Sequence, residues 1–219
     1  MELKGKIINF LGDSITEGVG TSGQDYVFHG LLKKKYGLKE VRNYGIGGTR
    51  IARQTEITCL TRDRDFILRA GMMNNDADVV VVFGGTNDFG NGQAPLGSID
   101  NMDMHTFYGG VHTLIRNLIH EYYNKHIVFI TPLHRLNEES CYGTWKPDGV
   151  EQRPLKDYVK AIREVCEYYS VPVLDLFASG ELAGNTPEWY NKYMPDGVHP
   201  NDEGHKIIAN KLGKLLENL

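Results

Sequence analysis

The chain has 219 residues, and its 24 Lys and Arg against 28 Asp and Glu give a formal net charge of −4. This mild acidity argues against a nucleic-acid-binding protein, which would normally carry a basic face. The hydrophobic share of 41% describes a soluble globular protein. A chain of this length can bury roughly 70% of its unfolded surface. We therefore expect one domain over residues 1–219 that needs no disulfide staples.

The first residues of the chain and its cysteines indicate the compartment in which the protein is expected. Met1–Lys6 is short and charged, and the apolar run after it is too brief for a signal-peptide core. No stretch approaches the roughly 18 apolar residues of a membrane span. Cys59, Cys141 and Cys166 are scattered, with no CxxC pair, so neither a disulfide framework nor a zinc site is indicated. The sequence predicts a reduced, cytoplasmic protein without a metal or an organic cofactor.

Five short apolar runs predict five β-strands. They are rich in Val, Ile and Phe, and several are apolar throughout, as is typical of parallel strands buried on both faces. The predicted strands are Lys6–Gly12, Glu40–Ile46, Asp78–Gly84, His126–Leu133 and Val171–Phe177.

Helical patterns lie between and after these strands. Apolar residues that recur every three or four positions predict amphipathic helices over Val27–Gly37, Phe107–Tyr122, Leu155–Tyr169 and Ile208–Leu219. Arg50–Met73 is less regular and predicts two short helical pieces. Alternating strands and helices predict an α/β protein, a three-layer α/β/α sandwich around a five-stranded parallel sheet. Right-handed crossovers and a single domain favour the flavodoxin-like strand order 2-1-3-4-5.

Ligands bind at the carboxyl ends of the strands in such a sheet. Three long, polar loops are expected there, at Phe89–Asp103, His134–Arg153 and Ala178–Val198. The chemistry of the protein is therefore sought in the residues that follow each strand.

The first strand ends in the sequence GDSIT, with Ser14 on the turn that leaves the strand. A serine exposed at this edge of the sheet is a candidate nucleophile. Taken alone, the simpler interpretation is that Asp13, Ser14 or Thr16 caps the following helix.

The second strand ends in NYGIGGT, which contains Gly45, Gly47 and Gly48. Glycines after a strand can hold positive φ angles and expose a backbone N–H to a ligand. The alternative is an ordinary tight turn. A dinucleotide site is weakly supported, because the third glycine of the G-x-G-x-x-G pattern is missing.

Two further motifs carry polar groups. In GGTND, after the third strand, the amide of Asn87 is a neutral donor that could face a developing oxyanion, or Asn87 could form a turn or cap a helix. Asp88 is expected to be solvated or to cap a helix. In DGVHP, Asp196 stands three residues before His199 and could orient one ring nitrogen, which leaves the other free as a base. The simpler interpretation is a glycine turn before a helix capped at Asn201, and this cap is expected in either case, since it is compatible with the Asp196–His199 pair.

The expected strand order joins these signals. Because the first strand lies between the second and third, the Ser14 N–H, the Gly48 N–H and the Asn87 amide could converge on one oxygen. The long loop before Asp196 could bring His199 to Ser14.

The four motifs, in this order, resemble those of the SGNH hydrolase superfamily, also called GDSL lipases and acylhydrolases. They extend from Gly12 to His199 and so cover nearly the whole chain. The resemblance implies ester hydrolysis, with Ser14 as nucleophile, His199 as base and Asp196 as its orienting partner. It also implies Ser14, Gly48 and Asn87 as oxyanion donors. The glycine run leaves Gly47 as an alternative to Gly48, and the family pattern favours the last glycine.

Other polar residues carry weaker signals. His134 and Arg135 follow the fourth strand and could line the pocket or end a solvated loop. Tyr142 and Trp145 could contact a sugar or an acyl chain, or simply anchor their loop. The charged run Asp63–Asp65 is expected at the surface.

The sequence therefore predicts a serine esterase that forms an acyl-enzyme on small esters, such as O-acetylated carbohydrates. A lysophospholipase or lipase-type acylhydrolase is the alternative within the same chemistry. Two alternatives have a different function: a flavodoxin-like phosphate or nucleotide binder, and a catalytically silent interaction module. Small-molecule esters are the expected partners, nucleic acid is not, and the oligomeric state is left open.

Overall fold

A computed structural model describes residues 1–56, 59–61, 63–140, 153–182 and 186–219. A parallel sheet with the order β2-β1-β3-β4-β5 lies at its centre. The strands are β1 (Ile7–Gly12), β2 (Glu40–Gly45), β3 (Val79–Phe83), β4 (His126–Ile130) and β5 (Val173–Leu174). The predicted α/β fold and the strand order 2-1-3-4-5 are confirmed.

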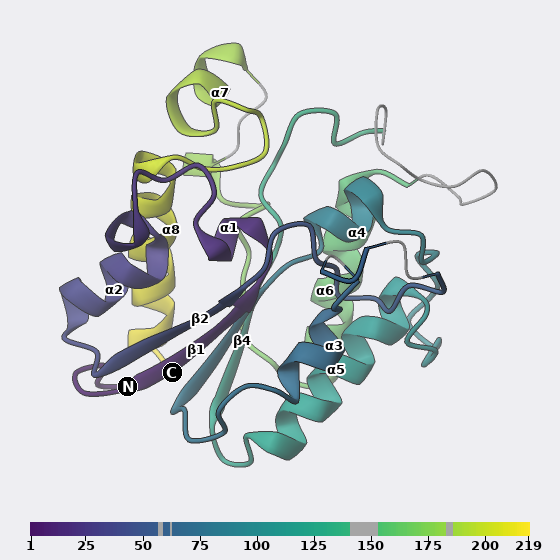
Figure 1. The fold of residues 1–219 in the computed structure, drawn as a ribbon, viewed down its shortest axis with the longest axis horizontal. Coiled ribbons are helices and arrows are strands. Elements are labelled where there is room, and N and C mark those ends of the chain that lie inside the picture. Colours follow the sequence, from purple (N-terminus) through teal and green to yellow (C-terminus); the bar gives the residue numbers. More distant parts are fainter. Residues whose placement is uncertain (57–58, 62, 141–152, 183–185) are drawn as a thin grey trace.

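The sheet is enclosed between two helical layers (Figure 1). On one face lie α2 (Phe28–Tyr36) and α8 (Asp202–Glu217), and on the other lie α3 (Phe66–Ala70), α5 (Phe107–Glu121) and α6 (Leu155–Tyr168). None of the helices in the described ranges is long and apolar enough to cross a bilayer.

The central strand β3 explains why its sequence is apolar throughout. Successive side chains of a strand point to opposite faces. Val79, Val81 and Phe83 accordingly pack in the core formed with α2 and α8. Val80 and Val82 pack in the core formed with α3, α5 and α6. A strand covered on both faces has no solvent-facing position for a polar residue.

The four predicted amphipathic helices are present, with shifted ends. The last helix, α8, begins at Asp202, as the expected cap at Asn201 requires, and six residues before Ile208, where the apolar periodicity starts. The reason is the cap at Asn201, whose side chain accepts the backbone N–H groups of Glu203 and Gly204 at 3.1 Å each. Asn201 lies two residues after His199, so the C-terminal motif ends where this helix begins.

Several predicted elements differ in the structure. β5 covers two residues instead of Val171–Phe177, because Pro172 has no N–H to donate and Asp175 turns away to accept from Arg163 and Thr131. The loop predicted at Ala178–Val198 contains α7 (Pro187–Tyr193), capped by the Thr186 side chain. Described residues of Arg50–Met73 form one α-helix, α3, rather than two. Short elements also occur: α1 (Ser14–Glu17), η1 (Gln24–Tyr26), α4 (Thr86–Asn91) and η2 (Gly180–Leu182).

Candidate active site

Three motifs meet at the carboxyl edge of the sheet because three strands end there in register. Gly12 of β1 pairs with Gly45 of β2 on one side and with Phe83 of β3 on the other. The chain then turns into α1, whose first residue is Ser14. The Asp13 side chain caps this helix by accepting the Ile15 N–H at 3.0 Å. The capping that the sequence offered as an alternative is thus present together with a serine at the sheet edge.

A continuous hydrogen-bonded chain joins Ser14 to the C-terminal motif. The Oγ atom of Ser14 lies 2.8 Å from Nε2 of His199. On the other side of the ring, Nδ1 lies 2.6 Å from Oδ2 of Asp196. A carboxylate only accepts, so its position assigns the neutral-ring proton to Nδ1 and leaves Nε2 to accept the hydroxyl proton. The arrangement can move a proton from Ser14 to His199.

The carboxylate of Asp196 is held by the turn that carries it. Its Oδ1 accepts the backbone N–H of Val198 at 2.9 Å and that of His199 at 2.7 Å. Partial burial pushes the pKa of Asp196 upward, but these N–H groups and the imidazole outweigh it and hold the pKa below its ordinary value. Asp196 therefore remains ionised beside the ring at neutral pH.

The three side chains differ in their access to solvent. Ser14 is 8% exposed, whereas the side chains of His199 and Asp196 are 21% and 55% exposed. The hydroxyl is thus set into the edge of the sheet, while the ring and the carboxylate lie toward water.

The hydrogen bonds of the glycine loop distinguish Gly47 from Gly48. The N–H of Gly47 donates to Oε2 of Glu17 at 2.7 Å. For Gly48, the described part of the chain offers its N–H no acceptor, and its φ of +76° is a left-handed conformation that favours glycine. Of the two N–H groups, that of Gly48 is the one available to a ligand.

Asn87 lies in the first turn of α4, and its side chain reaches the glycine loop. Its Nδ2 donates to the carbonyl of Thr49 at 3.1 Å. This contact uses one of the two amide hydrogens and leaves the second available. It also anchors the amide to the residue that follows Gly48. Neither of the expected alternatives, a turn or a cap, describes this contact.

The expectation for Asp88 was wrong. Its side chain is neither solvated nor a helix cap but buried, and its two oxygens accept the N–H groups of Ile51 and Ala52 at 3.0 and 2.9 Å. Burial raises the pKa of Asp88 to about 6, and the two N–H groups act in the opposite direction. Asp88 therefore ties the segment after the glycine loop to α4. In the sequence, the only indication of this role was the position of Asp88 directly after Asn87 in the motif GGTND.

The charged run at Asp63–Asp65 also differs from the expectation. Arg64 is exposed, as expected. The side chains of Asp63 and Asp65 are buried, however, and form ion pairs with Arg50 and Arg53. These carboxylates therefore belong to the interior between the glycine loop and α3, not to a surface network.

The residues after β4 make structural contacts. Both ring nitrogens of His134 face acceptors, Glu138 at 2.9 Å and the carbonyl of Phe177 at 2.9 Å. The Glu138 carboxylate raises the pKa of His134 above its ordinary value. Arg135 donates to the carbonyl and the hydroxyl of Thr86 at 3.2 and 3.0 Å.

The two residues are therefore not the ends of a solvated loop but link it to the segment after β5 and to α4. Tyr142 and Trp145 lie outside the described residues.

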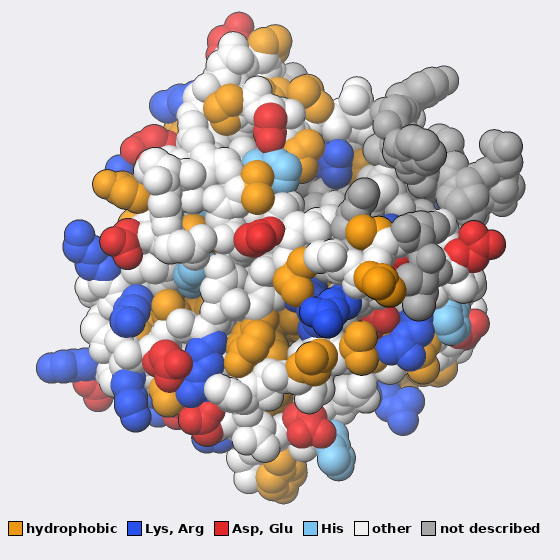
Figure 2. Space-filling model, in the orientation of Figure 1, with side chains coloured by type: hydrophobic (Ala, Val, Ile, Leu, Met, Phe, Trp, Pro, Cys, Tyr) orange, Lys and Arg blue, Asp and Glu red, His pale blue; other side chains and the backbone are white. Residues whose placement is uncertain are grey.

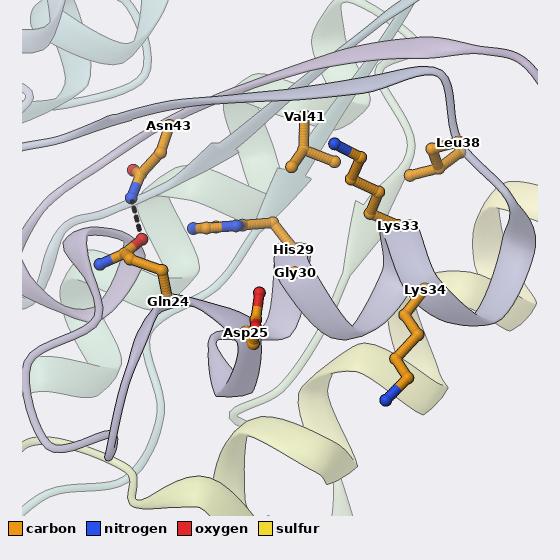
Figure 3. Close-up of a pocket in the computed structure, with 9 residues that line it drawn as sticks. All are labelled: Gln24, Asp25, His29, Gly30, Lys33, Lys34, Leu38, Val41 and Asn43. Atoms are coloured by element: carbon orange, nitrogen blue, oxygen red, sulfur yellow. Dashed lines mark hydrogen bonds between the residues drawn. The ribbon is translucent and has the colours of Figure 1, made fainter.

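A cavity of about 670 Å³ lies beside this site, between α2 and β2 (Figure 3). Gln24 and Asn43 line it, and both amides donate to the carbonyl of Glu17, at 2.9 and 3.4 Å. The cavity thus borders the turn that carries Ser14, but its lining includes neither Ser14 nor His199. Within the described ranges, no group of three or more His, Cys, Asp or Glu could hold a metal ion.

The comparison with known protein families gives one family for this chain. The model of the GDSL-like lipase/acylhydrolase family matches residues 10–207. The chain belongs to the GDSL-like lipase/acylhydrolase family. The protein is accordingly a carboxylic ester hydrolase. The match begins in β1 and ends in α8, so it includes all four motifs.

Solved structures share the fold of this chain. One is 34% identical, with a TM-score of 0.84, and the alignment covers 100% of this chain and 99% of that one. A protein of Lactobacillus plantarum is 29% identical, with a TM-score of 0.83 and 98% of each chain covered. A two-domain esterase active on acetylated mannans is 18% identical, with a TM-score of 0.63, over 99% of this chain and 50% of that one. No curated protein matches the chain.

Proposed function

We propose that this ester hydrolase works through an acyl-enzyme on Ser14 and acts on small esters with short acyl groups. The observation that carries the proposal is the hydrogen-bonded chain from Ser14 through His199 to Asp196, with distances of 2.8 and 2.6 Å. A base within this distance of a hydroxyl, oriented by a third group, is what an activated serine requires.

The reaction follows from these contacts. Nε2 of His199 takes the proton of the Ser14 hydroxyl as Oγ attacks the ester carbonyl carbon. The tetrahedral intermediate then collapses, and the imidazolium returns that proton to the departing alcohol oxygen. Water attacks the acyl-serine in the same way, with His199 as base, and releases the carboxylic acid and free Ser14. The Asp196 carboxylate holds the ring and stabilises the imidazolium that forms.

The negative charge of the intermediate requires donors at the sheet edge. We assign this role to the N–H groups of Ser14 and Gly48 and to the second amide hydrogen of Asn87. In the described part of the chain, the two backbone N–H groups have no protein acceptor. Neutral donors fixed in place before the reaction stabilise a developing oxyanion without reorganisation.

The surface supports a small substrate. Among the residues that the structure describes, Val19 and Leu136 are the well-exposed apolar side chains near the Ser14 and His199 turns, at 42% and 47%. On the face drawn in Figure 2, the described hydrophobic side chains are interspersed with acidic and basic ones. A lipase acting at an interface would present a larger apolar patch. These features suit a short acyl group and a hydrophilic alcohol, such as an O-acetylated sugar.

Covalent labelling tests the nucleophile. A fluorophosphonate should add one phosphonyl group to the wild type, located on the peptide that contains Ser14, and should not label Ser14→Ala. The exposed Ser98 provides a matched control, because Ser98→Ala should be labelled and should hydrolyse p-nitrophenyl acetate as the wild type does. Labelling elsewhere, or turnover by folded Ser14→Ala near that of the wild type, would exclude the assignment and favour a binding role for this edge.

A further inference from the structure

One buried arginine contacts the segments that carry the proposed oxyanion donors. Arg69 lies on α3 and is 5% exposed. Its Nη2 donates to the carbonyl of Gly12 at 3.0 Å and to Oγ1 of Thr49 at 2.7 Å. Its Nη1 donates to the carbonyl of Tyr44, and its Nε to the carbonyl of Arg64 at 3.0 Å.

The acceptors of Arg69 lie at the ends of two strands and in the glycine loop. Gly12 ends β1 two residues before Ser14, and Tyr44 lies at the end of β2 just before the glycine loop. Thr49 follows Gly48 directly, and its carbonyl accepts the Asn87 amide at 3.1 Å. Thus one guanidinium joins the two strand ends and the loop.

The hydroxyl of Thr49 extends this arrangement into the loop. It accepts from Arg69 and donates to the carbonyl of Ile46 at 2.7 Å. The loop from Ile46 to Thr49 is thereby closed at its base, with Gly48 inside it. Because peptide units are planar, fixing the atoms on either side of Gly48 restricts the direction of its N–H.

We propose that Arg69 is a positioning residue, which holds the Ser14 and Gly48 N–H groups and the Asn87 amide in the geometry that receives the oxyanion. The inference rests on the proposed function, since it concerns the same site. Arg69 acts through Gly12, Tyr44 and Thr49 and does not itself touch substrate. Its planar fork reaches acceptors in several directions at once, which a lysine ammonium on its flexible stem cannot reproduce fully.

Electrostatics supports the same role. The positive charge of Arg69 acts on buried Asp13, the residue before Ser14, and favours its ionised form against the larger effect of burial. One oxygen of this carboxylate, Oδ2, is buried and has no hydrogen-bond partner among the described residues. Loss of the guanidinium would therefore disturb the turn that presents the serine as well as the glycine loop.

The test separates positioning from general support of the fold. In Arg69→Met, kcat for p-nitrophenyl acetate should fall about 10²-fold, the scale of an ångström-size misplacement, while KM stays within threefold. The affinity for a methyl trifluoromethyl ketone, which forms a tetrahedral adduct with the serine, should fall by a similar factor. Arg69→Lys should recover part of both losses. All measurements are made well below the melting temperature of each variant.

Arg42→Met is the matched control. Arg42 lies on β2 and is also mostly buried, with ion pairs to Glu40 and Asp76, but it lies away from the carboxyl edge. Its loss should lower the melting temperature and leave kcat and the ketone affinity unchanged. An equal fall of kcat in Arg42→Met, or kcat within threefold of the wild type in Arg69→Met, would overturn the inference.

If Arg69→Met does not fold, two variants of Thr49 test the same inference. Thr49→Val removes one of the four acceptors of Arg69 and should lower kcat and ketone affinity about tenfold, whereas Thr49→Ser keeps the hydroxyl and should retain both. Equal values for Val and Ser would overturn the inference. Failure of the proposed function is distinguishable, because the wild type itself would then resist labelling at Ser14. If the wild type is labelled and the variants react as fast, only the role of Arg69 fails.

Discussion

Leu136 packs directly against Gly197, the residue that follows Asp196 in the turn leading to His199. The Leu136 N–H donates to the Gly197 carbonyl at 2.9 Å. A Cβ on Gly197 would lie 2.2 Å from Cδ1 of the Leu136 side chain, and the φ of Gly197 is +76°. The loop after β4 therefore supports the turn that presents the proposed base, and only glycine leaves room for this contact.

Gly197→Ala should displace that turn and lower kcat about 10²-fold, because the base must stay within hydrogen-bonding distance of Ser14. The strained backbone should also cost about 1–3 kcal/mol of unfolding free energy. Steady-state kinetics and urea denaturation measure the two effects. Leu136→Ala, which removes the obstruction without adding a Cβ, should affect kcat much less. Wild-type turnover by Gly197→Ala would show that the turn does not depend on this contact.

Asn87→Ala should lower kcat about 10²- to 10³-fold, the scale of one lost oxyanion donor. KM should change little, because the amide acts mainly on charge that develops after binding. Full Michaelis curves separate these parameters, and Asn101→Ala in an exposed loop segment is the control for loss of an asparagine. A change confined to KM would make Asn87 a binding residue instead.

Gly48→Ala and Gly47→Ala should differ. A Cβ at Gly48 requires a left-handed residue, with φ of +76°, at a cost of about 1–2 kcal/mol. We expect kcat to fall at least tenfold as the N–H shifts. At Gly47 the added Cβ would meet Oε2 of Glu17 at 3.0 Å, the flexible end of a side chain that can move aside. Kinetics of both variants test the choice, and a larger loss of kcat in Gly47→Ala would reverse it.

Asp13→Asn should change the pH dependence of stability. Burial raises the pKa of Asp13 to about 6 from an ordinary 3.8, against the opposing effects of the Ile15 N–H, His199 and Arg69. Between these values the folded state binds more protons than the unfolded state, so this group's contribution to stability falls as pH rises from about 4 to 6. The Asn variant lacks this loss and keeps a capping side chain.

Its unfolding free energy relative to the wild type should therefore rise over that interval, by on the order of 3 kcal/mol, and level off above pH 6. Urea denaturation at several pH values measures the difference. Asp202→Asn is a control of opposite sign. Hydrogen bonds from Ser22 lower the pKa of Asp202, so its stabilising contribution is present above its ordinary pKa and is lost as pH falls below it. A difference for Asp13→Asn that does not vary with pH would contradict the assigned pKa.

The substrate proposal predicts a preference for short acyl chains. Catalytic efficiency on p-nitrophenyl esters of two to sixteen carbons, below their aggregation limits, should be greatest between two and four carbons. The physical reason is the small exposed apolar area that residues 1–56, 63–140 and 186–219 present near Ser14 and His199. Acetylated sugars then test the alcohol side. A maximum at eight carbons or more would favour a lysophospholipase activity instead.

The sequence predicted those parts of the molecule whose signals are local. The apolar run of β3 and the periodicity of α5 and α6 locate buried elements directly, and the order of the four motifs locates Ser14, Asn87 and His199. The meeting of these residues also follows from topology, because parallel strands end at one edge. Two-residue β5 and seven-residue α7 were misjudged, since elements this short leave little periodicity to detect.

Arg69 and Asp88 could not be assigned from the sequence for a different reason. A charged side chain is exposed by default, and nothing local indicates that it will be buried against backbone groups. The acceptors of Arg69 lie 20 to 57 positions away along the chain, apart from Arg64. Only the folded sheet brings those two carbonyls and the Thr49 hydroxyl to one point.

The hydrogen bond between Ser14 and His199 spans 185 positions of the chain. Closing a loop of this length costs entropy that local helix and strand formation does not. Contacts so distant in sequence also slow folding, because the closure must precede the stabilising interactions that it permits. In a refolding experiment, helical signal can therefore return before hydrolysis does, and the regain of turnover reports the moment at which the two ends of the chain come together.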